Sequence, residues 1–255
     1  MNAPLPRAPL PEAAAALQLT GSTTLQPYMQ LAAEAYMQLH DVRVVINGGC
    51  GSARGFKALI DGTTDIAMAS GPASESIVSA AVARGAPLHA TIIRRDAILA
   101  VVHPSNPVQA LTLRQLNNIF TGRTTNWHAV GGLDRPIEVL VGPPAGGVSI
   151  SWRQLVLGSE DTYTASSQVL GAAARLAQAA ARPDTITFMP QMAVLPARVK
   201  ALRIDGLAAE SSPQQYPLYA PMMLVTLGPP SPAATRFMAH AARTATAPAR
   251  GESRE

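Results

Sequence analysis

Hydrophobic positions along the chain alternate between short continuous runs and sets spaced at helical intervals. The continuous runs predict strands at Ala16–Leu19, Val42–Ile46, Ile66–Ala69, His89–Arg94, Ala97–Val102, Ile137–Val141, Ile186–Phe188, Val199–Ile204 and Met222–Leu227. Helically spaced positions separate most of these runs. The alternation predicts an α/β fold with largely parallel sheets.

The helically spaced sets also predict which side of each helix faces inward. The predicted inward faces are Tyr28, Leu31, Ala32, Ala35, Tyr36 and Leu39; Phe56, Leu59 and Ile60; Ile77, Val78, Ala81 and Val82; Leu113, Leu116, Ile119 and Phe120; Trp152, Leu155 and Val156; Ala234, Phe237 and Met238. Pro27 suits the first turn of its helix, and Thr112 suits an N-cap. Further helices are predicted over Ser74–Arg84, Ser166–Ala181 and Ser231–His240.

Three strand-to-helix junctions are rich in glycine and small hydroxyl residues. They are Thr20–Thr24, Asn47–Ser52 and Gly142–Ser149. A helix N-terminus carries free N–H groups and partial positive charge, so these junctions can cradle an anion. The alternative is that the glycines serve only the backbone geometry of tight turns.

Composition and charge exclude several functional classes. Of 255 residues, 47% are hydrophobic and 14% are charged, as is typical of a folded chain. The net charge of +4 comes without a long Lys/Arg run or interleaved aromatic residues, so no nucleic acid is expected as a partner. No residue set has metal-site spacing, a nucleophile elbow or paired carboxylates, so no metal, cofactor or catalysis is expected.

Both the single cysteine and the N-terminus leave the cellular compartment undecided. Cys50 cannot form an internal disulfide; it is expected to be a small filler, and the alternative is a nucleophile. The leader, MNAPLPRAPLPEAAAALQL, shows no apolar core of signal-peptide length. No segment reaches the about 18–20 apolar residues that span a bilayer.

Four other residues each have a functional and a structural interpretation. His103 is a ligand or base, or a surface residue; Asp65 binds a cation or caps a turn. Trp127 and Trp152 are stacking platforms or core anchors. The structural interpretation is preferred for each.

Six segments, in order along the chain, resemble the substrate-binding protein of phosphate ABC importers. They are GSTTLQPYMQLAAEAY, GGCGSARGFKALIDGTTDIAMASGP, DAILAVVHPSNPVQALTLRQLNNIFTGRTTNWHAVGG, WRQLVLGS, VKALRIDG and YPLYAPMMLVT. The likeness runs from about Leu19 to Ala242, and its most specific part is LxQLxxIFTGxxTNWxxVGG.

The resemblance implies a two-lobe periplasmic binding protein type II fold with mixed, largely parallel sheets and a ligand cleft between the lobes. Lobe I would hold residues 1–97 and 200–255, and an inserted lobe II residues 98–199. The implied function is to capture a small oxyanion, phosphate by default, and deliver it to an ABC permease. The resemblance further implies a monomer in the periplasm or otherwise outside the cytoplasm, with no cofactor and no catalysis.

The resemblance also implies which residues bind the ligand. The carried-over positions are Ser22, Thr23 and Thr24; Gly51, Ser52 and Ala53; Ser70 and Gly71; and Gly146, Gly147 and Val148. Hydroxyl and backbone N–H groups at these positions are the expected donors.

The chain departs from the family's pattern at two of these contacts. Gly71 stands where some members have an acidic residue that accepts the phosphate proton, so weak discrimination between phosphate and sulfate is expected. Gly142 stands where members usually have an arginine, and Gly146–Val148 replaces a Ser-Gly-Thr turn. Removing a buried cation from its anion costs about 3–5 kcal/mol, so the departure predicts weaker phosphate binding than is usual. Arg54 is the candidate replacement cation, and the alternative is that it points to solvent.

Two further hypotheses use the same fold. The chain could be a binding or sensory module for a different ligand, with no role in transport. It could also be an enzyme with Ser52 or Cys50 as nucleophile, although the sequence displays no partnering base.

Overall fold

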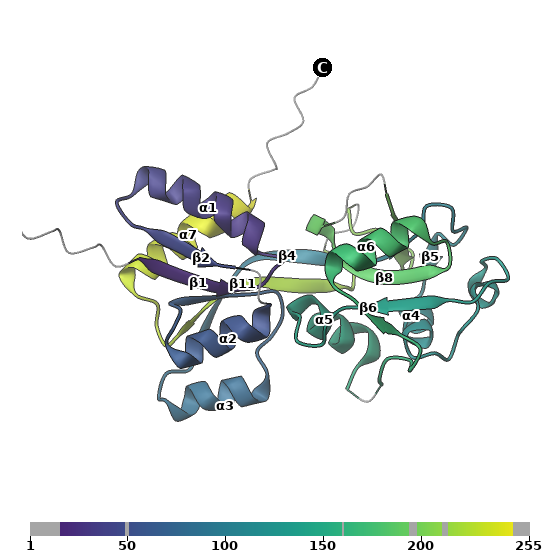
Figure 1. Cartoon of the computed structure of the whole chain (residues 1–255), viewed down its shortest axis with the longest axis horizontal. Coiled ribbons are helices and arrows are strands. Elements are labelled where there is room, and N and C mark those ends of the chain that lie inside the picture. Colours follow the sequence, from purple (N-terminus) through teal and green to yellow (C-terminus); the bar gives the residue numbers. More distant parts are fainter. Residues whose placement is uncertain (1–15, 49–50, 160, 194–197, 211–213, 247–255) are drawn as a thin grey trace, which may run out of the picture.

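A computed structural model of the chain describes residues 16–48, 51–159, 161–193, 198–210 and 214–246. Cys50 lies outside the described residues, so the choice between filler and nucleophile remains a prediction. The described chain is an α/β protein in which two groups of helices and strands lie at opposite ends of two long strands (Figure 1).

The elements follow the predicted alternation of strands and helices. The helices are α1 (Gln26–Leu39), α2 (Ser52–Asp61), α3 (Glu75–Ala83), α4 (Leu113–Phe120), α5 (Gly147–Trp152), α6 (Ala172–Ala181) and α7 (Pro232–Thr246), with short helical turns η1 (Trp127–Val130), η2 (Arg153–Leu157) and η3 (Gln191–Ala193). The strands are β1 (Leu17–Gly21), β2 (Val44–Asn47), β3 (Ile66–Ala69), β4 (Leu88–Val102), β5 (Ala110–Leu111), β6 (Glu138–Val141), β7 (Gln168–Val169), β8 (Thr185–Pro190), β9 (Lys200–Ala201), β10 (Arg203–Ile204) and β11 (Tyr219–Leu227).

The strands pair in the order β2-β1-β3-β11-β4-β8-β6-β7, with β9 also beside β4 and a separate pair formed by β5 and β10. Every antiparallel pairing among the described strands involves β4 or β11. The other pairings are parallel, as the βα alternation predicts. The sheet is therefore mixed because two strands cross between two parallel groups.

The long strand β4 corrects one sequence prediction. His89–Arg94 and Ala97–Val102 were expected as two runs separated by Arg95-Asp96, but they form one continuous strand. Its first part pairs with β11 up to Ala97, and its second part pairs with β8 from Ile98 onward. The polar interruption thus marks the change of pairing partner rather than a break in the strand.

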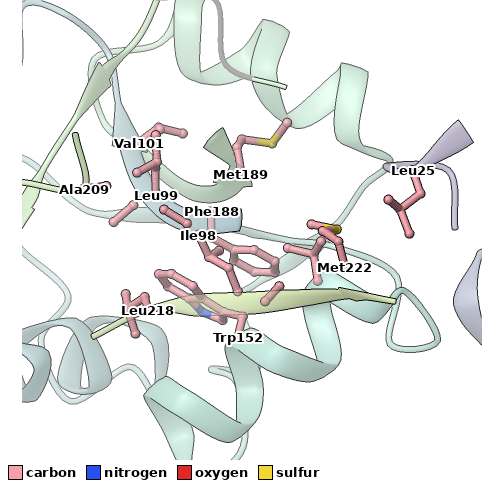
Figure 2. Close-up of a cluster of buried hydrophobic side chains, with 14 of the residues drawn as sticks. Leu25, Ile98, Leu99, Val101, Trp152, Phe188, Met189, Ala209, Leu218 and Met222 are labelled. Carbon is pink, nitrogen blue, oxygen red and sulfur yellow. The ribbon is translucent and has the colours of Figure 1, made fainter. Parts of the chain in front are cut away.

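The change of partner at Ala97 and Ile98 coincides with the predicted lobe boundary. The boundary expected at residue 200 differs from the pairing. β9 pairs with the second part of β4, and β10 pairs with β5, so residues 200–204 lie with the second group. Leu207 bridges to Ile204, and Ala209 and Leu218 lie in the cluster of Figure 2, so the chain returns to the first group along β11, which starts at Tyr219.

In the first group, α1 and α7 lie on one side of β1, β2 and β3, and α2 and α3 lie on the other (Figure 1). The inward face predicted for α1 was right for Ala32 and Tyr36, which are buried, and wrong for Leu31 and Leu39, which are 64% and 70% exposed. The buried face comprises Leu25, Met29, Ala32, Ala33 and Tyr36. Leu25, just before the helix, begins this stripe, and the Tyr36 ring meets the edge of Phe237 on α7.

The face predicted for α3 was right for Ala81 and Ile77 and wrong for Val78 and Val82. Val82 is 60% exposed, Val78 is exposed as well, and Ala81 is the buried residue of this helix. α3 lies outside α2 and contacts that helix more than the sheet, so it needs only a narrow apolar face (Figure 1).

The second group is built around large aromatic side chains. The rings of Trp152 and Phe188 stack with centroids 4.6 Å apart. Figure 2 shows both rings in one cluster with Met222 of β11 and with Leu218, which directly precedes β11. α4 begins at the N-cap predicted for Thr112, and the structure adds a complete capping box between Thr112 and Gln115. None of the described helices is both long enough and apolar enough to cross a membrane.

The helix predicted over Ser166–Ala181 begins later than expected. α6 starts at Ala172, because Gln168 and Val169 form β7 beside β6 and Gly171 is the N-cap. This late start turns the beginning of α6 toward the site described next.

Candidate functional site

A cavity of about 360 Å³ is lined by segments from both groups of the fold. The first group contributes Ser22, Thr23, Thr24, Gly51, Ser52 and Ser70; the second contributes Pro143, Ala145, Gly146, Gly147, Val148, Ser149, Gly171, Ala172 and Arg175. Most of these residues lie where a strand ends and a helix begins. The ligand position in open α/β sheets is this carboxyl edge of the parallel strands.

Three helices of eight residues or more begin at this cavity, and none has a side-chain cap. The N-caps are Leu25 for α1, Gly51 for α2 and Gly171 for α6, and no side chain at these positions accepts a capping hydrogen bond. Just before α1, Leu25 N donates to Ser22 Oγ at 3.4 Å. The free N–H groups of a helix start need partners, and the helix dipole makes this end positive. The cavity therefore collects positive backbone ends without any acidic cap to neutralise them.

Three buried serines form the part of the cavity wall that belongs to the first group. Ser22 Oγ donates to Ser70 Oγ at 3.0 Å, and Ser52 Oγ lies 3.4 Å from Ser70 Oγ. Ser70 N also donates to Ser52 Oγ at 3.1 Å. The two mutual bonds use two of the three hydroxyl protons, which leaves one O–H donor for an occupant of the cavity.

Arg175, on α6, is the charged side chain among the described lining residues, and it is 4% exposed. Nη1 donates to Thr187 Oγ1 at 3.1 Å and to the backbone carbonyl of Phe188. The guanidinium carbon lies 4.6 Å from the centroid of the Phe188 ring, a cation–π contact. Burial lowers the pKa of Arg175 to about 10, with Tyr163 opposing the shift, and no described acidic residue forms an ion pair with it.

The two groups touch at Gly147, the first residue of α5. A Cβ placed there would lie 2.5 Å from Ser52 Oγ and 2.6 Å from Ser70 Oγ. Gly71 meets the same backbone, since a Cβ on it would lie 2.4 Å from the carbonyl oxygen of Gly147. The two groups of the fold are in direct contact at Gly71 and Gly147, as expected for a closed arrangement around the cavity. A larger residue at position 71 or 147 would hold the groups apart.

The structure brings most of the residues carried over from the family resemblance to one place. Those that line the cavity are Ser22, Thr23, Thr24, Gly51, Ser52, Ser70, Gly146, Gly147 and Val148. Ala53 is half-buried and lies outside the lining, and Gly71 is buried against Gly147. Arg54, considered as the replacement cation, is exposed and does not line the cavity.

Sequence reasoning missed Arg175 and Ser149. A usable signal was present for Arg175, which is the single charged residue of an otherwise alanine-rich helix. Long side chains on helices point back toward the N-terminus, and Arg175 lies one turn from the start of α6. The late start of α6 hid this relation, because the predicted helix began at Ser166.

The other four residues singled out in the sequence, His103, Asp65, Trp127 and Trp152, do not line the cavity. His103 Nδ1 lies 2.8 Å from Ser105 Oγ, and Asp65 Oδ2 accepts a hydrogen bond from Gln18 N at 2.7 Å. Trp127 and Trp152 are buried in the core, as their structural interpretation predicts. Among the described residues, no cluster of His, Cys, Asp and Glu could hold a metal ion.

A model of the PBP superfamily domain matches residues 8–243 of the chain. The phosphate-binding protein PstS of Bacillus subtilis is 26% identical over 235 residues, which cover 89% of this chain and 75% of that protein. A match to phosphate-binding protein PstS 2 of Streptococcus agalactiae is 35% identical over 109 residues, 43% of this chain and 35% of that relative.

Among solved structures, a phosphate ABC transporter substrate-binding protein from Clostridium perfringens with bound phosphate is similar over most of its length. The TM-score is 0.79 at 27% sequence identity, and the match covers 89% of this chain and 92% of the other.

Proposed function

The chain belongs to the PBP superfamily, and from this membership and the geometry of the cavity we propose that it is a solute-binding protein that captures phosphate for ABC-type import. It works outside the cytoplasm, binds the anion without catalysis and delivers it to a permease in the membrane. The relatives named as phosphate-binding proteins, and the similar structure that holds phosphate, support this choice of ligand.

The observation that carries the proposal is the convergence of uncapped helix starts on one cavity. α1, α2 and α6 begin there without side-chain caps, and the buried hydroxyls of Ser22, Ser52 and Ser70 lie beside them. A tetrahedral oxyanion accepts hydrogen bonds on every side and favours positive helix ends. Such an anion would satisfy the N–H and O–H donors that the protein itself leaves open.

Release of the anion requires the two groups of the fold to separate. We expect them to act as two lobes that hinge on β4 and β11, because these strands are shared by both groups (Figure 1). We place the first boundary at residues 97 and 98 and the second near Tyr219, which pairs with Ala97 at the start of β11.

The cavity also bears on selectivity among oxyanions. None of its described lining residues is acidic. A carboxylate would accept the proton of hydrogen phosphate and would repel sulfate, which has no proton at neutral pH. We therefore expect sulfate to compete with phosphate.

Isothermal titration calorimetry with phosphate tests the proposal. One phosphate per chain with a dissociation constant in the micromolar range or tighter, at least about 8 kcal/mol of binding free energy, is expected. A second titration with sulfate present should show competition. Absence of binding by phosphate, sulfate and arsenate at millimolar concentration would contradict the proposal and favour a module for a different ligand.

A further inference from the structure

Building on the proposed function, we propose that Arg175 is the charge partner of the bound oxyanion. In this arrangement α6 brings the guanidinium into space that Gly142 leaves open. The arginine that the family resemblance would have put at position 142 is absent. Arg175 reaches the cavity from a different element of the fold.

The first argument is that Arg175 is a buried cation without a counterion. It is 4% exposed, and none of the ion pairs among the described residues includes it. A buried charge is retained in a folded protein when a partner or a ligand compensates it. The neutral contacts to Thr187 and Phe188 hold the group in place but supply no negative charge.

The second argument comes from the hydrogen-bond donors of the guanidinium. Both of its assigned hydrogen bonds to the protein come from Nη1. Nε is buried and has no hydrogen-bond partner among the described residues. An arginine fork can give two parallel hydrogen bonds to one oxyanion. Nη2, which has no hydrogen bond to the described residues and lies beside Gly142, supplies the first donor, and the enclosed Nε supplies the second when the side chain shifts on binding.

The third argument is the space at Gly142, directly after β6. A Cβ on this residue would lie 3.1 Å from Arg175 Nη2 and 2.4 Å from Ser149 Oγ. Ser149 and Arg175 both line the cavity. A side chain at position 142 would thus displace the two polar groups that the second group of the fold contributes, so Gly142 and Arg175 form one arrangement.

The test is calorimetric titration of phosphate into the full-length protein and into Arg175→Gln. Loss of the charge-assisted fork should weaken phosphate binding about 100-fold. The matched control is Arg182→Gln, which removes the same charge from the end of the same helix, at an exposed ion pair with Glu138. This control should change the affinity by less than about threefold.

A second variant, Gly142→Ala, keeps Arg175 and should weaken phosphate binding about 10-fold by displacing Nη2 and Ser149 Oγ. If Arg175→Gln does not fold, as circular dichroism would reveal, this variant decides the outcome. Wild-type affinity in either folded variant would overturn the role of Arg175 while leaving phosphate capture intact. Failure of the unaltered protein to bind any oxyanion would instead overturn the proposed function.

Discussion

The helices that begin at the cavity differ from those that begin elsewhere. α3 starts with Ser74, whose side chain accepts a hydrogen bond from Ile77 N, and α4 starts with the capping box of Thr112. α1, α2 and α6 start at the cavity with no side-chain cap. The chain caps its helices in the usual way where only stability is at stake, and leaves them open where we propose that an anion binds.

The same contrast holds for the two buried charged residues among the described residues, Arg175 and Asp96. Arg175 lines the cavity, whereas Asp96 lies in β4 near the point where that strand changes partners. One charge is placed where a ligand can compensate it, and the other is enclosed by the protein. If the open helix starts and Arg175 form the binding site, changes at these positions should lower phosphate affinity and changes elsewhere should not.

The largest expected effect comes from closing an open helix start with a negative cap. Gly171→Asp places a carboxylate at the N-cap of α6, where the backbone is extended and an added Cβ meets nothing within 4 Å. Positions 171 and 175 share a face of the helix, so the carboxylate would take the place of the anion beside Arg175. Phosphate affinity should fall at least about 100-fold.

The matched control for this change is Gly171→Asn, which caps the helix equally well without adding charge. It should lose far less affinity than the aspartate variant. Both variants should gain up to about 1 kcal/mol in the unfolding free energy without phosphate, measured in urea. Equal affinities for the two variants would show that charge at this helix start is irrelevant to binding.

Ser52→Ala tests the hydroxyls in the first group of the fold. The substitution removes a cavity-lining hydroxyl and leaves Ser70 N without the acceptor it has at 3.1 Å. Phosphate affinity should fall about 10-fold, and the unfolding free energy by about 1–3 kcal/mol. Ser79→Ala, an exposed position on α3, is the control; it should leave phosphate affinity unchanged and should not lower the unfolding free energy, because alanine favours the helix more than serine does. Unchanged phosphate affinity in the Ser52 variant would remove the serine cluster from the site.

Changes at the capped starts of α3 and α4 should lower the unfolding free energy and leave phosphate affinity unchanged. Ser74→Ala and Thr112→Ala each remove a side chain that accepts a hydrogen bond from a helix N–H. Each should lower the unfolding free energy by about 1 kcal/mol, measured by urea denaturation. Phosphate affinity, measured by calorimetry on the same preparations, should stay within error of the unaltered protein. A tenfold loss of affinity from either change would erase the distinction between the two classes of helix start.

The smallest effect is expected for Asp96→Asn, which removes the buried carboxyl that lies outside the cavity and should alter only the pH dependence of the unfolding free energy. Burial is the main cause that raises the pKa of Asp96, opposed by a hydrogen bond from Met192 N and by Arg94. An acid whose pKa is raised by folding favours the folded state at low pH, and this contribution is lost as the pH rises through and above the usual aspartate range. Asparagine does not ionise, so the Asp96→Asn variant does not lose this stability as the pH rises.

Urea denaturation of the two proteins at several pH values measures this difference. The stability of Asp96→Asn relative to the unaltered protein should increase from about pH 4 to about pH 7. The stabilisation by added phosphate should be the same in both proteins. A stability difference independent of pH would contradict the burial of an ionisable Asp96.

The sequence was most informative where local chemistry alone determines the structure. The glycine-rich junctions, the capping of α4 and the core tryptophans could all be predicted from neighbouring residues. The faces of α1 and α3 could be predicted only in part, because their exposed edges depend on which layers cover those helices. Arg175 could not be assigned to the site because its placement depends on the tertiary position of α6, which begins only after the β7 edge strand.

A crystal structure of the protein grown with arsenate tests the central claim most directly, because arsenic scatters anomalously and marks the position of the tetrahedral anion. One anomalous peak is expected in the cavity, with anion oxygens about 3 Å from the guanidinium of Arg175 and from backbone nitrogens at the starts of α1, α2 and α6. An empty cavity at saturating arsenate, or an anion bound elsewhere with Arg175 unpaired, would contradict it.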